Sequence, residues 1–303
     1  MTAQNPSPEL SVVVVVLTGG DSLRRCLEAL QSQMPAEKLE IIVPHTANLE
    51  GTDAFRSQFP RVRFLQAPGK ASYAALRTTG VRAAGGRIVA ITEDQCIPPA
   101  HWCANVLTAH HSPHAAVGGP VEKYQPDTAL GWAIYLREFT NYIPPVEEGT
   151  SPFLTDCNVS YKRAALEAIR SVWADVFHEP NVHAALRQRG ETLWLSPALV
   201  TLQQRTMPLG VALRERYNFG RLYGSLRVAS VPLWKRMLLI LASLILPLLF
   251  LGRVVLTVLR KGRYVAACLR AFPYLALFSL AWAWGEFVGY LTRRAAAVLD
   301  TER

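Results

Sequence analysis

The 303-residue sequence has few cysteines and no pattern that would organise them. Its five cysteines form no Cys-x-x-Cys pair, which argues against a zinc ribbon or a secreted disulfide scaffold and favours a reducing compartment. The sequence also lacks Gly-x-Gly-x-x-Gly and Walker patterns, so dinucleotide binding and P-loop chemistry are poorly supported. No basic segment precedes the short apolar run at 12–17, so we do not expect a signal peptide there.

Acidic residues are scarce in the last third of the chain. Residues 1–204 contain 17 Lys and Arg against 19 Asp and Glu, whereas residues 205–303 contain 15 against 4. The same basic part holds the long apolar runs, and this combination indicates contact with anionic lipid headgroups rather than with nucleic acid. We therefore expect membrane lipids, and no nucleic acid, among the partners.

Two apolar stretches, 237–259 and 264–292, carry few charges. At about 1.5 Å per residue, each is long enough to cross a hydrocarbon core of about 30 Å. The flanking Lys and Arg residues predict that both ends lie on the cytoplasmic side of the cell (inner) membrane. A re-entrant or interface-lying hairpin, or two buried helices of a soluble protein, are the alternatives. We therefore expect three parts: a first domain at 1–204, a basic amphipathic juxtamembrane segment at 205–236, and a helical hairpin with a short tail at 237–303.

The first 204 residues alternate between predicted strands and helices. Val12 to Leu17 is a continuous β-branched run of the kind found in a central parallel strand that is covered on both faces. The pattern predicts an α/β fold with a mostly parallel, Rossmann-like sheet, in which ligands bind at the carboxyl ends of strands. We expect strands at 12–17, 40–43, 62–65, 87–92 and 192–195, and helices at 71–84, 163–170 and 181–189.

Charged residues occur where such a sheet would bind ligands. Glu93 and Asp94 end a predicted strand, and adjacent carboxylates can hold a hard divalent cation, which in turn can hold a diphosphate. A solvated acidic turn is the plainer alternative. Arg77 lies on the apolar stripe of its predicted helix, so it faces either a bound anion or an ordinary buried ion pair.

Six segments follow one another in an informative order: SVVVVVLTGGDSLRRCLEAL, KLEIIVPHTANLEGT, GKASYAALRTTGVRAAGGRIVAITEDQC, DCNVSYKRAALEAI, FHEPNVHAALRQRG and RERYNFGRLYG. Over about residues 10–230, this order resembles glycosyltransferase family 2, the GT-A nucleotide-sugar transferases. The resemblance implies a GT-A fold, a nucleotide-sugar donor and Mg²⁺ or Mn²⁺. Together with the C-terminal hairpin, it implies a lipid-linked or cell-envelope glycan acceptor.

The resemblance also assigns roles to individual residues. Glu179 falls where the family places its catalytic base, and His178 beside it would tune or orient that base. Glu93, Asp94 and Gln95 fall on the metal-binding motif. The resemblance implies that the donor or its phosphates are contacted by Thr18, Gly19, His45, Lys70, Arg77, Arg216 and Arg221. It places Asp156 and Asn158 on the acceptor side.

The sequence departs from the family pattern in the donor and metal motifs. The donor-loop aspartates fall on His45 and Thr46, and Gln95 offers only a neutral carbonyl to a metal. An exposed helix-start carboxylate is the alternative reading of Glu179. A catalytically impaired membrane scaffold or binding protein on the same fold is the alternative function. We favour a metal-assisted, inverting transferase because Glu93, Asp94 and Glu179 are all present; the sequence permits an oligomer.

Overall fold

The computed structural model describes residues 8–33, 35, 38–69 and 71–294. They fall into two compact units, one within 1–122 and 142–204 and the other within 123–141 and 205–303. The second unit takes in 123–141, a segment that the sequence pattern alone placed in the first domain.

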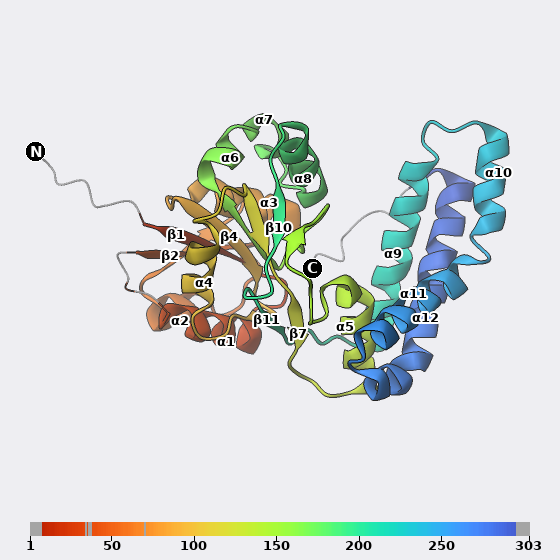
Figure 1. The fold of residues 1–303 in the computed structure, drawn as a ribbon, viewed down its shortest axis with the longest axis horizontal. Coiled ribbons are helices and arrows are strands. Elements are labelled where there is room, and N and C mark those ends of the chain that lie inside the picture. Colours follow the sequence, from red (N-terminus) through yellow and green to blue (C-terminus); the bar gives the residue numbers. More distant parts are fainter. Residues whose placement is uncertain (1–7, 34, 36–37, 70, 295–303) are drawn as a thin grey trace, which may run out of the picture. The chain divides into compact units, whose positions relative to one another are not determined.

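The first unit is built on an eight-stranded sheet in the order β3-β2-β1-β4-β9-β6-β10-β8 (Figure 1). The strands β3, β2, β1 and β4 are parallel, whereas β9 runs antiparallel to both β4 and β6. This arrangement confirms the predicted α/β fold with a mostly parallel sheet. The strands are β1 (Leu10–Val15), β2 (Leu39–His45), β3 (Val62–Gln66), β4 (Ile88–Glu93), β6 (Ala116–Gly118), β8 (Gly149–Thr150), β9 (Asn158–Lys162) and β10 (Leu193–Leu195).

Helices cover both faces of this sheet, because alternate side chains of each strand point to opposite sides. Val12 and Val14 of β1 pack with α1, α2 and α4, whereas Val13 and Val15 pack with α3, α6, α7 and α8. The buried, β-branched β1 therefore lies at the centre of two apolar layers. The helices are α1 (Gly20–Gln31), α2 (Thr52–Gln58), α3 (Tyr73–Ala83), α4 (Trp102–Ala109), α6 (Arg163–Glu167), α7 (Arg170–Trp173) and α8 (Glu179–Gln188).

A small second sheet follows the carboxyl end of β4. It has the order β5-β11-β7, formed by Cys96–Ile97, Thr201–Gln203 and Val121–Lys123. The backbone N–H of Gln204 donates to the carbonyl of Gln95 over 2.9 Å. This bond ties the segment after β4 to the residue that follows β11. All five cysteines are free and buried.

The second unit is helical. It consists of α5 (Ala129–Phe139), α9 (Leu209–Arg227), α10 (Leu233–Ala242), α11 (Leu246–Lys261) and α12 (Val265–Thr292). By length and composition α12 can cross a membrane, and α10 with α11 can form a second, bent candidate. The apolar stretch expected at 237–259 is thus two helices, which meet at 56°. Pro247, in the first turn of α11, lacks the N–H that would continue α10.

Glycines allow α9 and α12 to pack backbone against backbone. A Cβ atom added at Gly220 or Gly224 of α9 would lie 2.2 Å from the carbonyl oxygen of Trp282 or 2.6 Å from that of Glu286. On α12, a Cβ at Gly285 would lie 2.1 Å from the Tyr217 oxygen. Each helix therefore presents glycines four residues apart, an arrangement that permits close helix contact.

We expect Gly224→Ala to destabilise the second unit, because its methyl group would meet the Glu286 backbone, which cannot move independently of α12. Overpacking of this kind typically costs about 1–3 kcal/mol, measurable as a lower thermal midpoint in detergent. Gly252→Ala in α11 is the matched control, since a Cβ there would meet nothing within 4 Å. Its effect should be neutral or slightly stabilising; equal midpoints for the two variants would contradict the close packing.

Candidate active site

The carboxylate of Asp94 holds the loop between β1 and α1. Its oxygens accept from the backbone N–H groups of Leu17 (3.0 Å), Thr18 (2.9 Å) and Gly19 (2.6 Å). Gly19 (φ 70°) and Gly20 (φ 54°) have left-handed backbone angles that glycine adopts without strain, which lets these N–H groups converge. The helix α1 begins at Gly20, after the N-cap residue Gly19, without a side-chain cap.

The whole segment after β4 is buried. Glu93, Asp94 and Gln95 are 8%, 0% and 4% exposed, so the solvated acidic turn is wrong. The side-chain amide of Gln95 donates to the hydroxyl of Thr18 over 3.3 Å, which adds to the hold on the β1–α1 loop. Thr18 and Gly19, expected at the donor, therefore contact Asp94 and Gln95.

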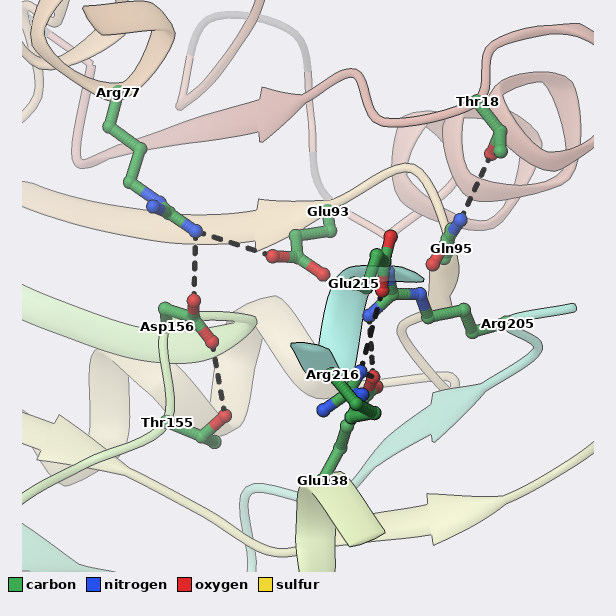
Figure 2. A network of polar contacts seen from close by, with 10 residues as sticks. All are labelled: Thr18, Arg77, Glu93, Gln95, Glu138, Thr155, Asp156, Arg205, Glu215 and Arg216. Carbon is green, nitrogen blue, oxygen red and sulfur yellow. Dashed lines mark hydrogen bonds and ion pairs between the residues drawn. The ribbon is translucent and has the colours of Figure 1, made fainter. Parts of the chain in front are cut away.

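One guanidinium is shared by three carboxylates, as Figure 2 shows for two of them. The Nη2 atom of Arg77 lies 2.9 Å from Asp156 and 3.3 Å from Glu93. Its Nε atom lies 2.7 Å from the Oε1 atom of Glu179. The four residues come from α3, the end of β4, the segment before β9 and the start of α8, at the carboxyl edge of β4. Of the two alternatives for Arg77, the structure shows the buried ion pair.

Glu179 is buried by the way α8 begins. His178 is the N-cap residue, Glu179 is the first residue of the helix, and Pro180 follows it. Glu179 is 7% exposed, so it is not the exposed helix-start carboxylate of the alternative reading. His178 is exposed and its backbone carbonyl accepts from Asn181 and Val182.

The burial of this cluster changes its protonation. Burial raises the pKa of Glu179 to about 7, against the opposing effect of Arg77, and Asp156 raises it further. Burial alone would lower the pKa of Arg77, but Asp156, Glu179 and Glu93 together raise it above its usual value. The cluster thus pairs a permanent cation with a carboxyl group that changes charge near neutral pH.

Comparison of the sequence and the structure with known proteins shows which family the chain belongs to. Residues 11–170 match the family described as Glycosyl transferase family 2. The chain belongs to glycosyltransferase family 2. A solved structure, the mannosyltransferase PcManGT from Pyrobaculum calidifontis in complex with GDP-Man and Mn²⁺, is 18% identical. With a TM-score of 0.52, the match covers 95% of this chain and 86% of that one, and it shows the GT-A fold. No curated protein matches the sequence significantly.

Two other expected site residues of this family 2 member, His45 and Asn158, make their polar contacts outside the Arg77 cluster. His45 ends β2 and is buried, with Nδ1 2.8 Å from the carbonyl of Thr46. Asn158 is committed to the fold, because its side chain bonds Trp102, Pro120 and Leu199. Arg216 and Arg221 belong to α9 of the second unit, where Arg216 pairs with Glu138 and Glu215, and Arg221 donates to the carbonyl of Arg294; Lys70 lies outside the described residues.

The sequence did not predict a buried contact between Tyr161 and His183, which lies on the same helix as Glu179. The hydroxyl of Tyr161 lies 2.9 Å from Nε2 of His183, and both side chains are buried. Burial raises the pKa of Tyr161, and the negative charge of Glu179 raises it further. His183 lies four residues after Glu179 on α8, so helical spacing from the predicted base was the one available signal.

The residues present do not complete a site for Mg²⁺ or Mn²⁺ by themselves. Such ions require several oxygen ligands. The oxygens of Asp94 are occupied by backbone N–H groups, and one oxygen of Glu93 faces Arg77. Gln95 contributes a buried, neutral Oε1 atom that has no hydrogen-bond partner in the described chain. Among the described residues, no group of three or more His, Cys, Asp or Glu side chains is placed to hold a metal.

We expect Asp94→Asn to destabilise the first unit, because an amide would direct N–H at backbone groups that also donate. Losing hydrogen bonds to a buried charged group typically costs about 1.5–3 kcal/mol. Urea unfolding followed by intrinsic fluorescence measures the loss. Asp53→Asn is the matched control, since Asp53 is exposed and makes only a surface ion pair with Arg56. A midpoint for Asp94→Asn equal to the control would show that Asp94 does not hold the loop.

Proposed function

We propose that this family 2 glycosyltransferase moves a sugar from a nucleoside-diphosphate sugar to an acceptor hydroxyl with inversion, and that Glu179 is the catalytic base. The observation that supports this is the ion pair between Arg77 and Glu179, in a cluster that also holds Glu93 and Asp156. A carboxylate held in one position by a buried cation is suited to receive a proton from a defined direction.

In the proposed step, the acceptor oxygen forms a bond to the anomeric carbon while the bond from that carbon to the diphosphate breaks. The acceptor proton passes to Glu179, and the nucleoside diphosphate leaves with the bonding electrons. The raised pKa of Glu179, about 7, places its proton affinity close to the operating pH, where a general base is most effective. Arg77 and Asp156 position Glu179 and Glu93 for this step.

The donor class rests on the family and the fold. The solved mannosyltransferase of the same fold was captured with GDP-Man and Mn²⁺. For this chain we infer a nucleoside-diphosphate sugar of unspecified base and sugar. Any Mg²⁺ or Mn²⁺ would take most of its ligands from the donor, since Glu93 and Gln95 alone supply too few.

The acceptor and location follow from the second unit. We infer a lipid-linked or cell-envelope glycan acceptor, with the chain attached to the inner membrane through α10, α11 and α12 and the first unit in the cytoplasm. The length and composition of α12, and of α10 with α11, support membrane association. The bend between α10 and α11 suits either a broken span or a re-entrant hairpin.

The change Glu179→Gln separates a transferase from a scaffold on the same fold. Glutamine keeps the volume but cannot accept the proton, so turnover at saturating donor should fall about 10²- to 10⁴-fold while donor affinity stays within threefold. The assay follows release of the nucleoside diphosphate from a panel of nucleotide-sugars. In the wild type, the rate should fall about tenfold per pH unit below about pH 7, where Glu179 is protonated.

Glu167→Gln is the matched control, because Glu167 makes an exposed ion pair with Arg170 on α6 and α7. Its turnover should stay within twofold of wild type. Turnover of Glu179→Gln within threefold of wild type would show that Glu179 is not the base, and Asp156→Asn would then test the other carboxylate of the cluster. Absence of turnover with every donor would favour the scaffold.

Binding of Mn²⁺ tests the incomplete metal site directly. Without donor, we expect the wild type to bind Mn²⁺ with Kd weaker than about 10⁻⁴ M in calorimetry, as sites with few charged ligands do. Gln95→Glu replaces the neutral Oε1 atom by a carboxylate of the same shape and should tighten Mn²⁺ binding at least about tenfold. Micromolar binding by the wild type, or no gain in the variant, would contradict the assigned positions of Glu93 and Gln95.

A further inference from the structure

Arg137 of the second unit forms no ion pair with any carboxylate of the described residues. Its guanidinium carbon lies 4.7 Å from the ring centre of Trp282 on α12 and 5.3 Å from that of Phe250 on α11. Its Nε atom is buried and has no hydrogen-bond partner in the described chain. Arg137 as a whole is half-buried, and an arginine with polar atoms shielded from water is ordinarily paired, because removing a charge from water is costly.

The glutamates Glu138 and Glu215 of the same unit already pair with other arginines. Arg205 lies 2.7 Å from Glu138 and 3.0 Å from Glu215. Arg216 contacts the same two carboxylates, so two arginines and two glutamates balance one another, as Figure 2 shows. Neither glutamate of this network forms an ion pair with Arg137.

Glu286 is the third buried carboxylate of the unit, and it is held by its own helix. It accepts from the indole N–H of Trp282 over 2.6 Å and from the hydroxyl of Tyr290. It makes no ion pair with Arg137 within the described residues. Glu286 thus fixes the orientation of the Trp282 ring against which Arg137 stacks.

The surroundings of Arg137 are short of negative charge. Burial lowers the pKa of Arg137 to about 10, and the positive charges of Arg216 and Arg253 act in the same direction. Glu138 and Glu286 oppose this only in part. Because Glu138, Glu215 and Glu286 are each held by other side chains, an anion that pairs with Arg137 would have to come from outside the described residues.

The helices that supply the two rings also carry exposed apolar side chains. Such a surface suits hydrocarbon rather than water. The exposed side chains on α10, α11 and α12 include Leu238, Leu241, Leu248, Leu249, Leu256, Leu269, Leu280 and Trp284. An anion with a long apolar chain would satisfy both the arginine and these faces.

We propose that Arg137, stacked on Trp282 and Phe250, binds the phosphate group of a lipid. A guanidinium donates two parallel hydrogen bonds to phosphate oxygens, and aromatic stacking fixes the plane in which it does so. The lipid chain lies along the apolar helices of the same unit. The inference rests on the proposed function only in treating such a lipid as an acceptor; binding itself depends on the second unit alone.

The test measures lipid binding to the full-length protein in neutral detergent by native mass spectrometry. The probes are an isoprenyl monophosphate, phosphatidylglycerol, diacylglycerol and inorganic phosphate, which separate a lipid monoester, a lipid headgroup, a lipid without phosphate and a free anion. We expect Arg137→Gln to weaken binding of at least one lipid phosphate at least tenfold. Arg260→Gln, which removes an exposed arginine of α11, should change it less than twofold.

Arg137→Lys covers the case in which Arg137→Gln does not fold. Lysine keeps the charge but loses the fork of donors, so lipid phosphate binding should weaken about three- to tenfold. Unchanged binding in both variants, equal binding of diacylglycerol, or equal affinity for inorganic phosphate would each overturn the proposal. Donor turnover without acceptor should be unchanged in Arg137→Gln, so this result is independent of the outcome for Glu179.

Discussion

The sharing of Arg77 by three carboxylates is the interaction on which the proposed chemistry of this protein depends. Asp156, Glu93 and Glu179 are far apart in the sequence, and one guanidinium brings them together at the carboxyl edge of β4. A buried cation permits several carboxylates to lie in little water, but it cannot lower all their pKa values equally. Glu179 retains a raised pKa because burial outweighs its contact with Arg77. Positioning and proton affinity thus come from one ion-pair network.

A second constraint acts on the segment after β4. Asp94 binds three successive backbone N–H groups of the β1–α1 loop, so it serves as an internal anchor for that loop. Glu93 and Gln95, on either side of it, point elsewhere: Glu93 faces Arg77 and Gln95 contacts Thr18. Since Gln95 is neutral, the segment holds the backbone of the loop but offers little charge to a cation.

The second unit contains buried charged side chains among apolar helices. Glycines of α9 and α12 allow backbone contact, and this packing buries Glu215, Arg216 and Glu286 beside apolar residues. Each buried glutamate finds donors: arginines for Glu215, an indole and a phenol for Glu286. Arg137 has rings in place of a carboxylate, which is why its charge remains open to a ligand.

The sequence alone determined the mostly parallel α/β fold, the apolar C-terminal segments and the glycosyltransferase family, because hydrophobic periodicity and the order of motifs can be read directly along the chain. Short elements such as α4, β6 and β11 were not foreseen, since tertiary contacts rather than propensity stabilise them. Arg77 could be placed on a buried helix face, but its partners could not be named, because they come from three other elements. Only the tertiary structure decided that Asp94 is an anchor, that Glu179 is buried, and that residues 123–141 join the helical unit. Such choices depend on side chains that are distant in sequence and meet only when the chain has folded.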